Sequence, residues 1–96
     1  MAFSDSQRDV RPAPFVVAGL ELLIALPLVT ADDVDRWDME SARFQDAVEA
    51  QFPGFEYEHH VWHFLTDSDI RRTDAGYREQ QHRAIVRYIE RLRSAD

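Results

Sequence analysis

Three of the four histidines in this chain of 96 residues lie within five consecutive positions, inside segment 56–64. A helix turns by about 100° per residue, so the acids and histidines of residues 56–67 would gather on one side of a helix there. His59 and His63 are four residues apart, the spacing at which two imidazoles on one helical face can bind one metal ion. Glu56 or Asp67 would add an oxygen ligand. The sequence therefore predicts a candidate site for zinc or another ion that prefers imidazole.

The same segment does not favour a protease. The string from His59 to His63 has the histidine spacing of the zinc-protease motif H-E-x-x-H, but His60 stands where that motif has its catalytic Glu. The sequence also offers no Ser-His-Asp or Cys-His arrangement that could supply a nucleophile. Its three glycines are scattered, which argues against a glycine-rich phosphate loop. We therefore expect a protein without catalytic machinery.

A second pattern resembles helical di-iron proteins. Two stretches have the Glu-x-x-His spacing that these bundles place on two of their four helices: Glu56 to His59 and Glu79 to His82. The resemblance would imply bound iron, with further carboxylates supplied nominally by Glu21 and Glu40. The helices expected here are short compared with that pattern, so iron is a secondary expectation behind zinc.

The most apolar stretch, residues 15–29, contains a single acid, Glu21. Pro14 suits the first position of a helix that runs to about Leu26 and stops at Pro27. Such a helix is apolar nearly all round, so we expect it to be buried in the core or in an oligomer interface. Glu21 would then be a solvent-facing acid paired with an arginine, or, as a third hypothesis for function, a buried general base or metal ligand.

Residues 15–29 admit other interpretations. Several β-branched residues favour a strand, which would give an α+β fold, but no two-residue alternation runs through the segment. Fifteen residues are too few to span a bilayer, so we expect no membrane segment. A signal peptide is a further alternative, because residues 29–31 form an acceptable cleavage site. The acid within the run and the balanced charges before it are atypical of such a leader, and we expect a cytoplasmic protein.

Two oppositely charged helices are expected in the remaining chain. Thr30 is a good N-cap for a helix that runs to about Gln51, and residues 32–49 contain seven acids against two arginines. Asp74 would cap a last helix to about Arg93, and residues 71–93 contain seven arginines against three acids. Arg83, Arg87 and Arg91, spaced by four, form a basic stripe. Like charges at this spacing repel, so the stripe should face the acidic helix, within a subunit or across a homodimer.

Composition limits the classes of fold and partner. With 45% hydrophobic residues the chain can form one core, and we predict an all-α bundle of about four helices. Residues 13–94 would form a single domain after a flexible tail at 1–12. The net charge of −7 argues against nucleic acid as a partner, and the lack of cysteine excludes disulfides and thiolate metal sites.

The sequence thus favours a small acidic module for protein–protein interaction or regulation. Trp62, flanked by histidines and acids, would be an exposed anchor of the kind that interfaces favour. The predicted binding surface adds His60, Arg83, Arg87 and Arg91 to this anchor. Histidines in such a surface would make binding depend on pH between about 5 and 7. The alternative is a metal-binding helical protein that uses the His59/His63 pair.

Overall fold

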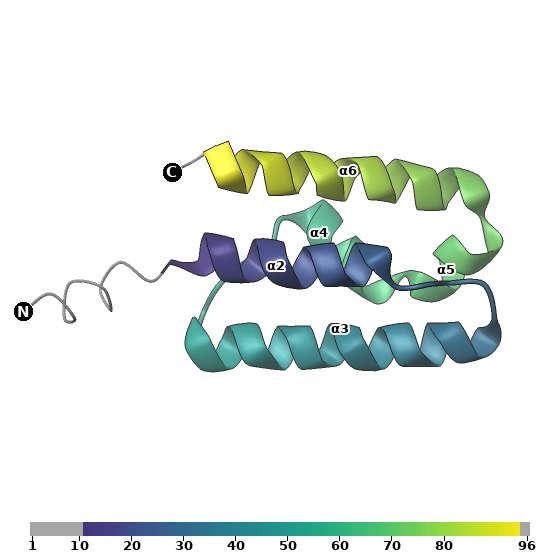
Figure 1. Ribbon diagram of the computed structural model, residues 1–96, viewed down its shortest axis with the longest axis horizontal. Coiled ribbons are helices and arrows are strands. Elements are labelled where there is room, and N and C mark those ends of the chain that lie inside the picture. Colours follow the sequence, from purple (N-terminus) through teal and green to yellow (C-terminus); the bar gives the residue numbers. More distant parts are fainter. Residues whose placement is uncertain (1–10, 95–96) are drawn as a thin grey trace, which may run out of the picture.

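The computed structural model describes residues 11–94, and within that range every regular element is an α-helix (Figure 1). The helices are α2 (Pro12–Ala25), α3 (Ala31–Gln51), α4 (His59–Thr66), α5 (Ser68–Thr73) and α6 (Ala75–Ser94). The predicted all-α fold is confirmed, and the alternative strand at 15–29 is wrong because α2 occupies most of that segment. Residues 1–10 of the predicted tail lie outside the described part of the chain, and Pro12 is already helical.

The chain runs up and down along one axis (Figure 1). Helix α2 packs between α3 and α6 on one face of the bundle, and the α4–α5 segment packs against the same two helices on the other face. Helices α3 and α6 therefore lie on opposite sides and run in the same direction. The predicted pairing of acidic α3 with basic α6 inside one subunit is wrong. The ion pairs of α6 found among residues 11–94 use Glu21, Glu58 and Glu79 instead.

Helix α3 begins at the predicted cap. The Thr30 hydroxyl accepts a hydrogen bond from the Asp33 amide at 3.2 Å, while the Asp33 carboxylate accepts from the Thr30 amide at 3.0 Å. These and the bond from the Val29 amide lower the pKa of Asp33, because backbone hydrogen bonds favour its charged form. The helix ends before Gly54, which adopts a φ of 83° that other residues avoid.

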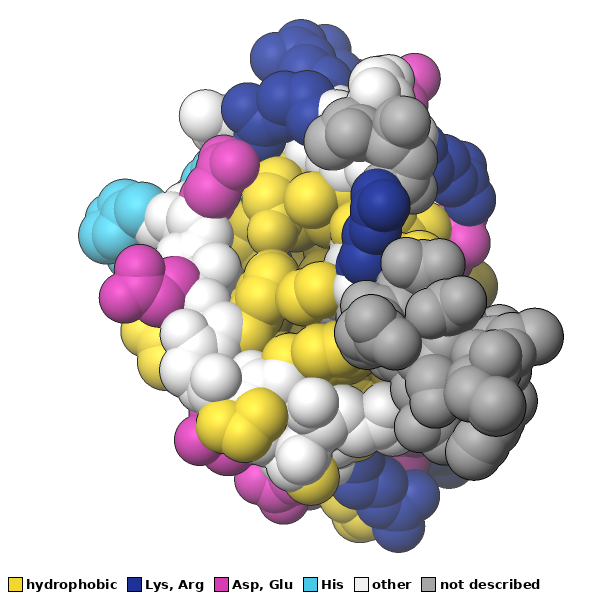
Figure 2. Space-filling model, turned by 90° about the vertical axis from the view of Figure 1, so that its left-hand side faces the viewer, with side chains coloured by type: hydrophobic (Ala, Val, Ile, Leu, Met, Phe, Trp, Pro, Cys, Tyr) yellow, Lys and Arg dark blue, Asp and Glu magenta, His cyan; other side chains and the backbone are white. Residues whose placement is uncertain are grey.

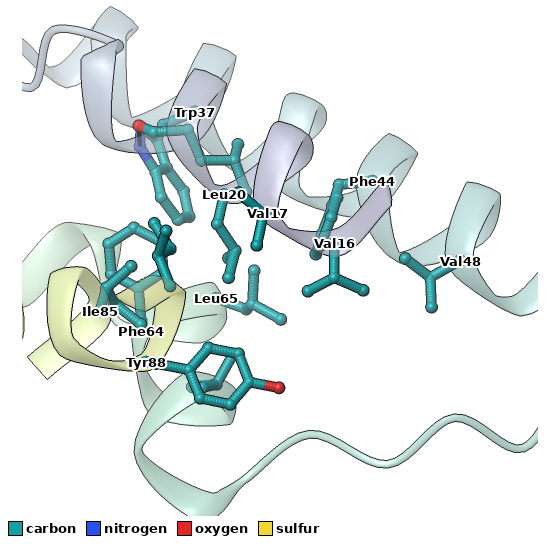
Figure 3. Packing of buried hydrophobic residues seen from close by; sticks show 13 residues of the cluster. Val16, Val17, Leu20, Trp37, Phe44, Val48, Phe64, Leu65, Ile85 and Tyr88 are labelled. Atoms are coloured by element: carbon teal, nitrogen blue, oxygen red, sulfur yellow. Dashed lines mark hydrogen bonds between the residues drawn. The ribbon is translucent and has the colours of Figure 1, made fainter. Parts of the chain in front are cut away.

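The hydrophobic core is formed by buried residues of α2, α3, α4 and α6 (Figure 3). At its centre Trp37 is 1% exposed, and its indole N–H donates to the Leu23 carbonyl oxygen at 3.0 Å. The Phe64 ring meets the Trp37 ring edge-on, with centroids 5.2 Å apart. The buried residues of α3 are Trp37, Ser41, Phe44 and Val48, which recur at intervals of four, three and four and form one face of the helix.

Helix α2 is covered on one face only. Val16 and Leu20 are completely buried, whereas Leu22 is 72% exposed and Ala18 is also exposed. The expectation of a helix buried all round is therefore wrong for the single chain. Over residues 11–94, no helix combines the length and apolar character needed to cross a bilayer.

The close approach of α2 to α3 generates a prediction about Gly19. A Cβ atom on Gly19 would lie 2.2 Å from ring atoms of Phe44, so Gly19→Ala must displace a buried ring. We expect the free energy of unfolding to fall by about 1–3 kcal/mol in urea denaturation. Gly76→Ala is the matched control, because its Cβ would meet no atom closer than 3.5 Å. It should be neutral or stabilise α6 by up to about 1 kcal/mol. Equal stability of the two variants would contradict the close packing.

Candidate functional site

Helix α4 presents different chemistry on each of its sides. Val61, Phe64 and Leu65 are buried in the core, and Glu58 precedes the helix as its N-cap. The helical geometry places His59 and His63 on the opposite, solvent-facing ridge. Trp62 points to the α3 side of this ridge, and His60 points to the α6 side. The predicted binding surface is therefore divided between two grooves that flank the helix: Trp62 lies in one, His60, Arg87 and Arg91 lie in the other, and Arg83 lies in neither.

The groove on the α3 side combines aromatic rings with carboxylates. The Trp62 ring is 47% exposed and stacks on Tyr57, with centroids 5.8 Å apart and an interplanar angle of 16°. Phe55 meets Tyr57 edge-on at 5.3 Å and extends this wall. The groove has a volume of about 570 Å³, and we call it the acidic groove; its lining is Gln45, Asp46, Val48, Glu49, Phe55, Glu56, Tyr57 and Trp62. Three exposed carboxylates thus surround an exposed aromatic wall.

Tyr57 is held in this wall without a hydrogen bond. Its hydroxyl oxygen is buried and has no partner among the described residues. Burial raises the pKa of Tyr57 to about 12, and the negative charges of Tyr88 and Glu49 act in the same direction. The phenol is therefore neutral at physiological pH, and the negative charge of the groove comes from its three carboxylates.

The groove on the α6 side contains two arginines and a histidine and has a volume of about 670 Å³. We call it the basic groove; its lining is His60, Ala84, Arg87, Glu90, Arg91 and Ser94. Arg91 is fixed there, since its guanidinium donates to Glu58 at 2.8 Å and lies 5.7 Å above the Tyr88 ring. His60 meets the same ring edge-on at 5.7 Å. Arg87 makes no ion pair with any residue of the described range, and its charge is available to a partner.

The two histidines of the ridge belong to a chain of hydrogen bonds. The Nε2 atoms of His59 and His63 lie 3.0 Å apart, and Nδ1 of His63 lies 3.3 Å from Asp67 Oδ2. Asp67 also accepts a hydrogen bond from the Tyr77 hydroxyl at 2.6 Å, and the Gln81 amide donates to that hydroxyl at 2.8 Å. The bond to Asp67 raises the pKa of Tyr77, because it requires the protonated phenol.

The chain ends at a buried arginine. Arg71 is 2% exposed, and one guanidinium nitrogen donates to the Phe64 carbonyl oxygen at 2.6 Å and to Gln81 at 2.7 Å. The guanidinium carbon lies 4.4 Å from the ring centroids of both Trp37 and Phe64. Burial lowers the pKa of Arg71 to about 10, so the group is still charged at neutral pH.

The predicted metal ligands are only partly brought together. Helix α4 begins at His59 rather than at Glu56, so Glu56 lines the acidic groove instead of joining the histidine ridge. Asp67 contacts Nδ1 of His63, whereas His59 contacts Nε2 of the same ring. Within residues 11–94, no three His, Asp or Glu side chains converge as a metal site. The di-iron site suggested by the two Glu-x-x-His stretches is therefore not formed within residues 11–94 of a single chain.

Glu21 is exposed, and its carboxylate accepts from the Arg93 guanidinium at 2.6 Å. The ordinary interpretation, a solvent-facing acid paired with an arginine, is confirmed. The interpretation of Glu21 as a buried general base is wrong, because the residue lies on the open face of α2.

The charges differ between the two sides of α4. Viewed from the end where α3 and α6 finish, basic side chains gather at the top over α6, histidine lies at the left, and acidic side chains occur both above and below it (Figure 2). The sequence indicated the arginine stripe and Trp62, but not that Asp46 and Glu49 of α3 line the same groove as Trp62. The spacing of acids on α3 was visible, whereas their proximity to Trp62 depends on how α4 docks.

Comparisons with protein-family models, with curated proteins and with solved structures found no match.

The buried guanidinium generates a prediction about stability. Arg71→Met should lower the free energy of unfolding by about 1–3 kcal/mol in urea, because the Phe64 carbonyl and the Gln81 amide oxygen lose their donor. Arg71→Lys should also destabilise, since an ammonium group lacks the planar guanidinium that lies against the rings of Trp37 and Phe64. Arg72→Met, on the same helix, should change stability by less than about 0.5 kcal/mol. Similar stabilities for the Met variants at positions 71 and 72 would contradict this role.

The tyrosines generate a prediction about alkaline pH. Burial raises the pKa of Tyr88 as well, so all three tyrosines resist ionisation in the folded chain. An acid whose folded pKa is raised stabilises the fold below its unfolded pKa, and that stability is lost as pH rises from 10 towards 12. Tyrosinate absorbance should therefore develop together with loss of the helical circular-dichroism signal.

In urea the same groups should titrate near their ordinary pKa of about 10. Tyr57→Phe removes the unpartnered hydroxyl and should reduce the alkaline loss of stability. Ionisation of all three phenols near pH 10 with unchanged helicity would contradict the burial of Tyr57 and Tyr88 and the hydrogen bond of Tyr77 to Asp67.

Proposed function

We propose that the protein is a small protein–protein interaction module whose acidic groove binds a cationic segment of a partner. The observation that carries this proposal is the exposed Trp62 ring, stacked on Tyr57 and surrounded by three carboxylates. An aromatic face attracts a cation through its quadrupole, and carboxylates provide charged hydrogen-bond acceptors for the same group. An arginine or lysine side chain satisfies both requirements.

The wall of the groove favours binding because it is already ordered. Tyr57 is fixed between Phe55 and Trp62, so the rings lose little freedom when a ligand enters. Aromatic residues of this kind dominate the energetics of protein interfaces. Asp46, Glu49 and Glu56 make no ion pair with another described side chain, so their charges are free to meet those of a partner.

The electrostatics of the chain support a protein rather than a nucleic acid as the partner. The net charge of −7 and the acids on α3 repel phosphate, and the arginines of α6 occupy only one side of the bundle.

We place the module in the cytoplasm. The apolar segment that could act as a leader supplies Val16 and Leu20 to the core, so cleavage after it would destroy the fold.

Fluorescence of Trp62 tests the proposal. Trp37 is buried, so a change in tryptophan emission on adding an arginine-rich peptide should report on Trp62. We expect saturable binding that weakens as salt is added, because exposed charges are screened. The double variant Asp46→Asn/Glu49→Gln should weaken binding about tenfold, at about 0.7 kcal/mol for each carboxylate.

The matched control is Asp32→Asn/Asp35→Asn, which removes two exposed acids of the same helix outside the groove. It should bind the peptide with nearly the affinity of the unmodified chain. A peptide with glutamine in place of arginine should not bind. Equal weakening by both double variants would show that net charge, and not the groove, attracts the peptide, and the proposal would be wrong.

A further inference from the structure

The histidine ridge of α4 has the geometry of half a metal site. The Nε2 atoms of His59 and His63 lie 3.0 Å apart, and two neighbouring ligands of a tetrahedral zinc ion are separated by roughly 3.3 Å. Without a metal ion the two Nε2 atoms must share one proton, since two N–H groups cannot point at each other at this distance. A cation that accepts both lone pairs would replace that proton with only a small opening of the rings.

Asp67 orients His63 for metal binding. Its carboxylate lies 3.3 Å from Nδ1 of His63, so Nδ1 carries the proton and Nε2 presents a lone pair to the outside. Asp67 is itself held by the Tyr77 hydroxyl at 2.6 Å, and Tyr77 by Gln81. A carboxylate that orients a histidine from behind is the usual outer contact of a zinc ligand.

One copy supplies only two ligands, because no third His, Asp or Glu of residues 11–94 converges on the pair. Both imidazoles are exposed and lie on the side of α4 away from the core. A second copy that meets the first along this ridge would present the same two imidazoles. Four imidazole nitrogens then supply the four ligands that zinc takes in a closed site.

The charges on either side of the ridge determine the relative orientation in which two copies associate. Asp46 and Glu49 belong to the C-terminal half of α3, Arg87 and Arg91 belong to that of α6, and these halves lie at the same end of the bundle (Figure 1). A two-fold axis along the ridge brings the acidic groove of each copy opposite the basic groove of the other. A two-fold axis across the ridge would oppose like charges, which is unfavourable.

We propose that zinc joins two copies of this chain along α4, bound by His59 and His63 of both, with acidic grooves facing basic grooves. This inference rests on the proposed function, because the cationic partner of the acidic groove is a second copy of the chain. Arg87 and Arg91 of that copy supply the positive charge. The metal ion fixes the register, and on each side of it the acids of one groove, Asp46, Glu49 and Glu56, face Arg87 and Arg91 of the other copy.

The test is the mass of the untagged full chain, measured by sedimentation velocity after chelator treatment and again with added zinc sulfate. We expect a monomer without zinc, a dimer with it, and one zinc ion for every two chains. His59→Ala and His63→Ala should each abolish the zinc-dependent dimer. His82→Ala, an exposed histidine of α6 outside the ridge, should leave it unchanged. Cobalt in place of zinc should give the strong visible absorption of a tetrahedral site.

Two further variants test the supporting contacts. Asp67→Asn should weaken zinc affinity about 10- to 100-fold, because the orienting contact to His63 is lost, while the helical content stays the same. Asp46→Asn/Glu49→Gln should weaken the dimer without changing the zinc stoichiometry. A monomer at saturating zinc, or a dimer that survives His59→Ala and His63→Ala, would overturn the inference.

These outcomes separate the two proposals. If the arginine-rich peptide binds the acidic groove but zinc leaves the chain monomeric, the interaction module stands and the metal-linked dimer is wrong. If zinc gives a dimer that needs both histidines, while the peptide does not bind and the groove variant leaves the dimer unchanged, the metal bridge stands. In that case the cationic partner of the groove is wrong.

Discussion

The rest of the bundle depends on the contacts that the buried guanidinium of Arg71 makes with its neighbours. The guanidinium lies against the rings of Trp37 from α3 and Phe64 from α4, and it donates to Gln81 of α6. Trp37 in turn donates to the Leu23 carbonyl of α2. One cation on the shortest helix therefore connects every helix of the described chain. A buried charge without such contacts would cost several kcal/mol, so the surrounding rings and acceptors must be in place together.

This constraint also determines the surface. Because Arg71 holds the end of α4 through the Phe64 carbonyl, the short helix is fixed between α3 and α6 with Trp62 on one side and His60 on the other. Gln81 continues the contact to Tyr77 and Asp67, which orients His63 at the exposed ridge. The ridge is thus ordered from within the core, and a ligand would not have to organise it.

Separation of charge is the second consequence of the fold. Placing α2 on one face and α4–α5 on the other keeps acidic α3 away from basic α6, so among residues 11–94 the arginines of α6 form their ion pairs with acids outside α3. Exposed charges of one sign are tolerated in water, where each repulsive pair costs only a few tenths of a kcal/mol. They become useful at an interface, where complementary potentials guide association and fix its orientation.

The sequence by itself determined the local elements. Thr30 and Asp33 form a capping box from their own side chains, and the periodicity of Trp37 and its neighbours defines the buried face of α3, so both could be predicted. It also determined the His59/His63 pair, since residues four apart on a helix are always neighbours. These features depend on contacts within one helical turn, and no distant residue is needed to explain them.

Only the tertiary structure decided which residues meet across the bundle. The stretch Ile70-Arg71-Arg72 is locally polar, and nothing in it indicates that Arg71 is buried while Arg72 is not; the difference comes from aromatic rings of distant helices. The late start of α4 has a similar cause, because Phe55 and Tyr57 pack their rings ahead of the helix and leave Glu56 in a groove. The candidate site arises where α4 docks, and docking depends on packing between segments far apart in the chain.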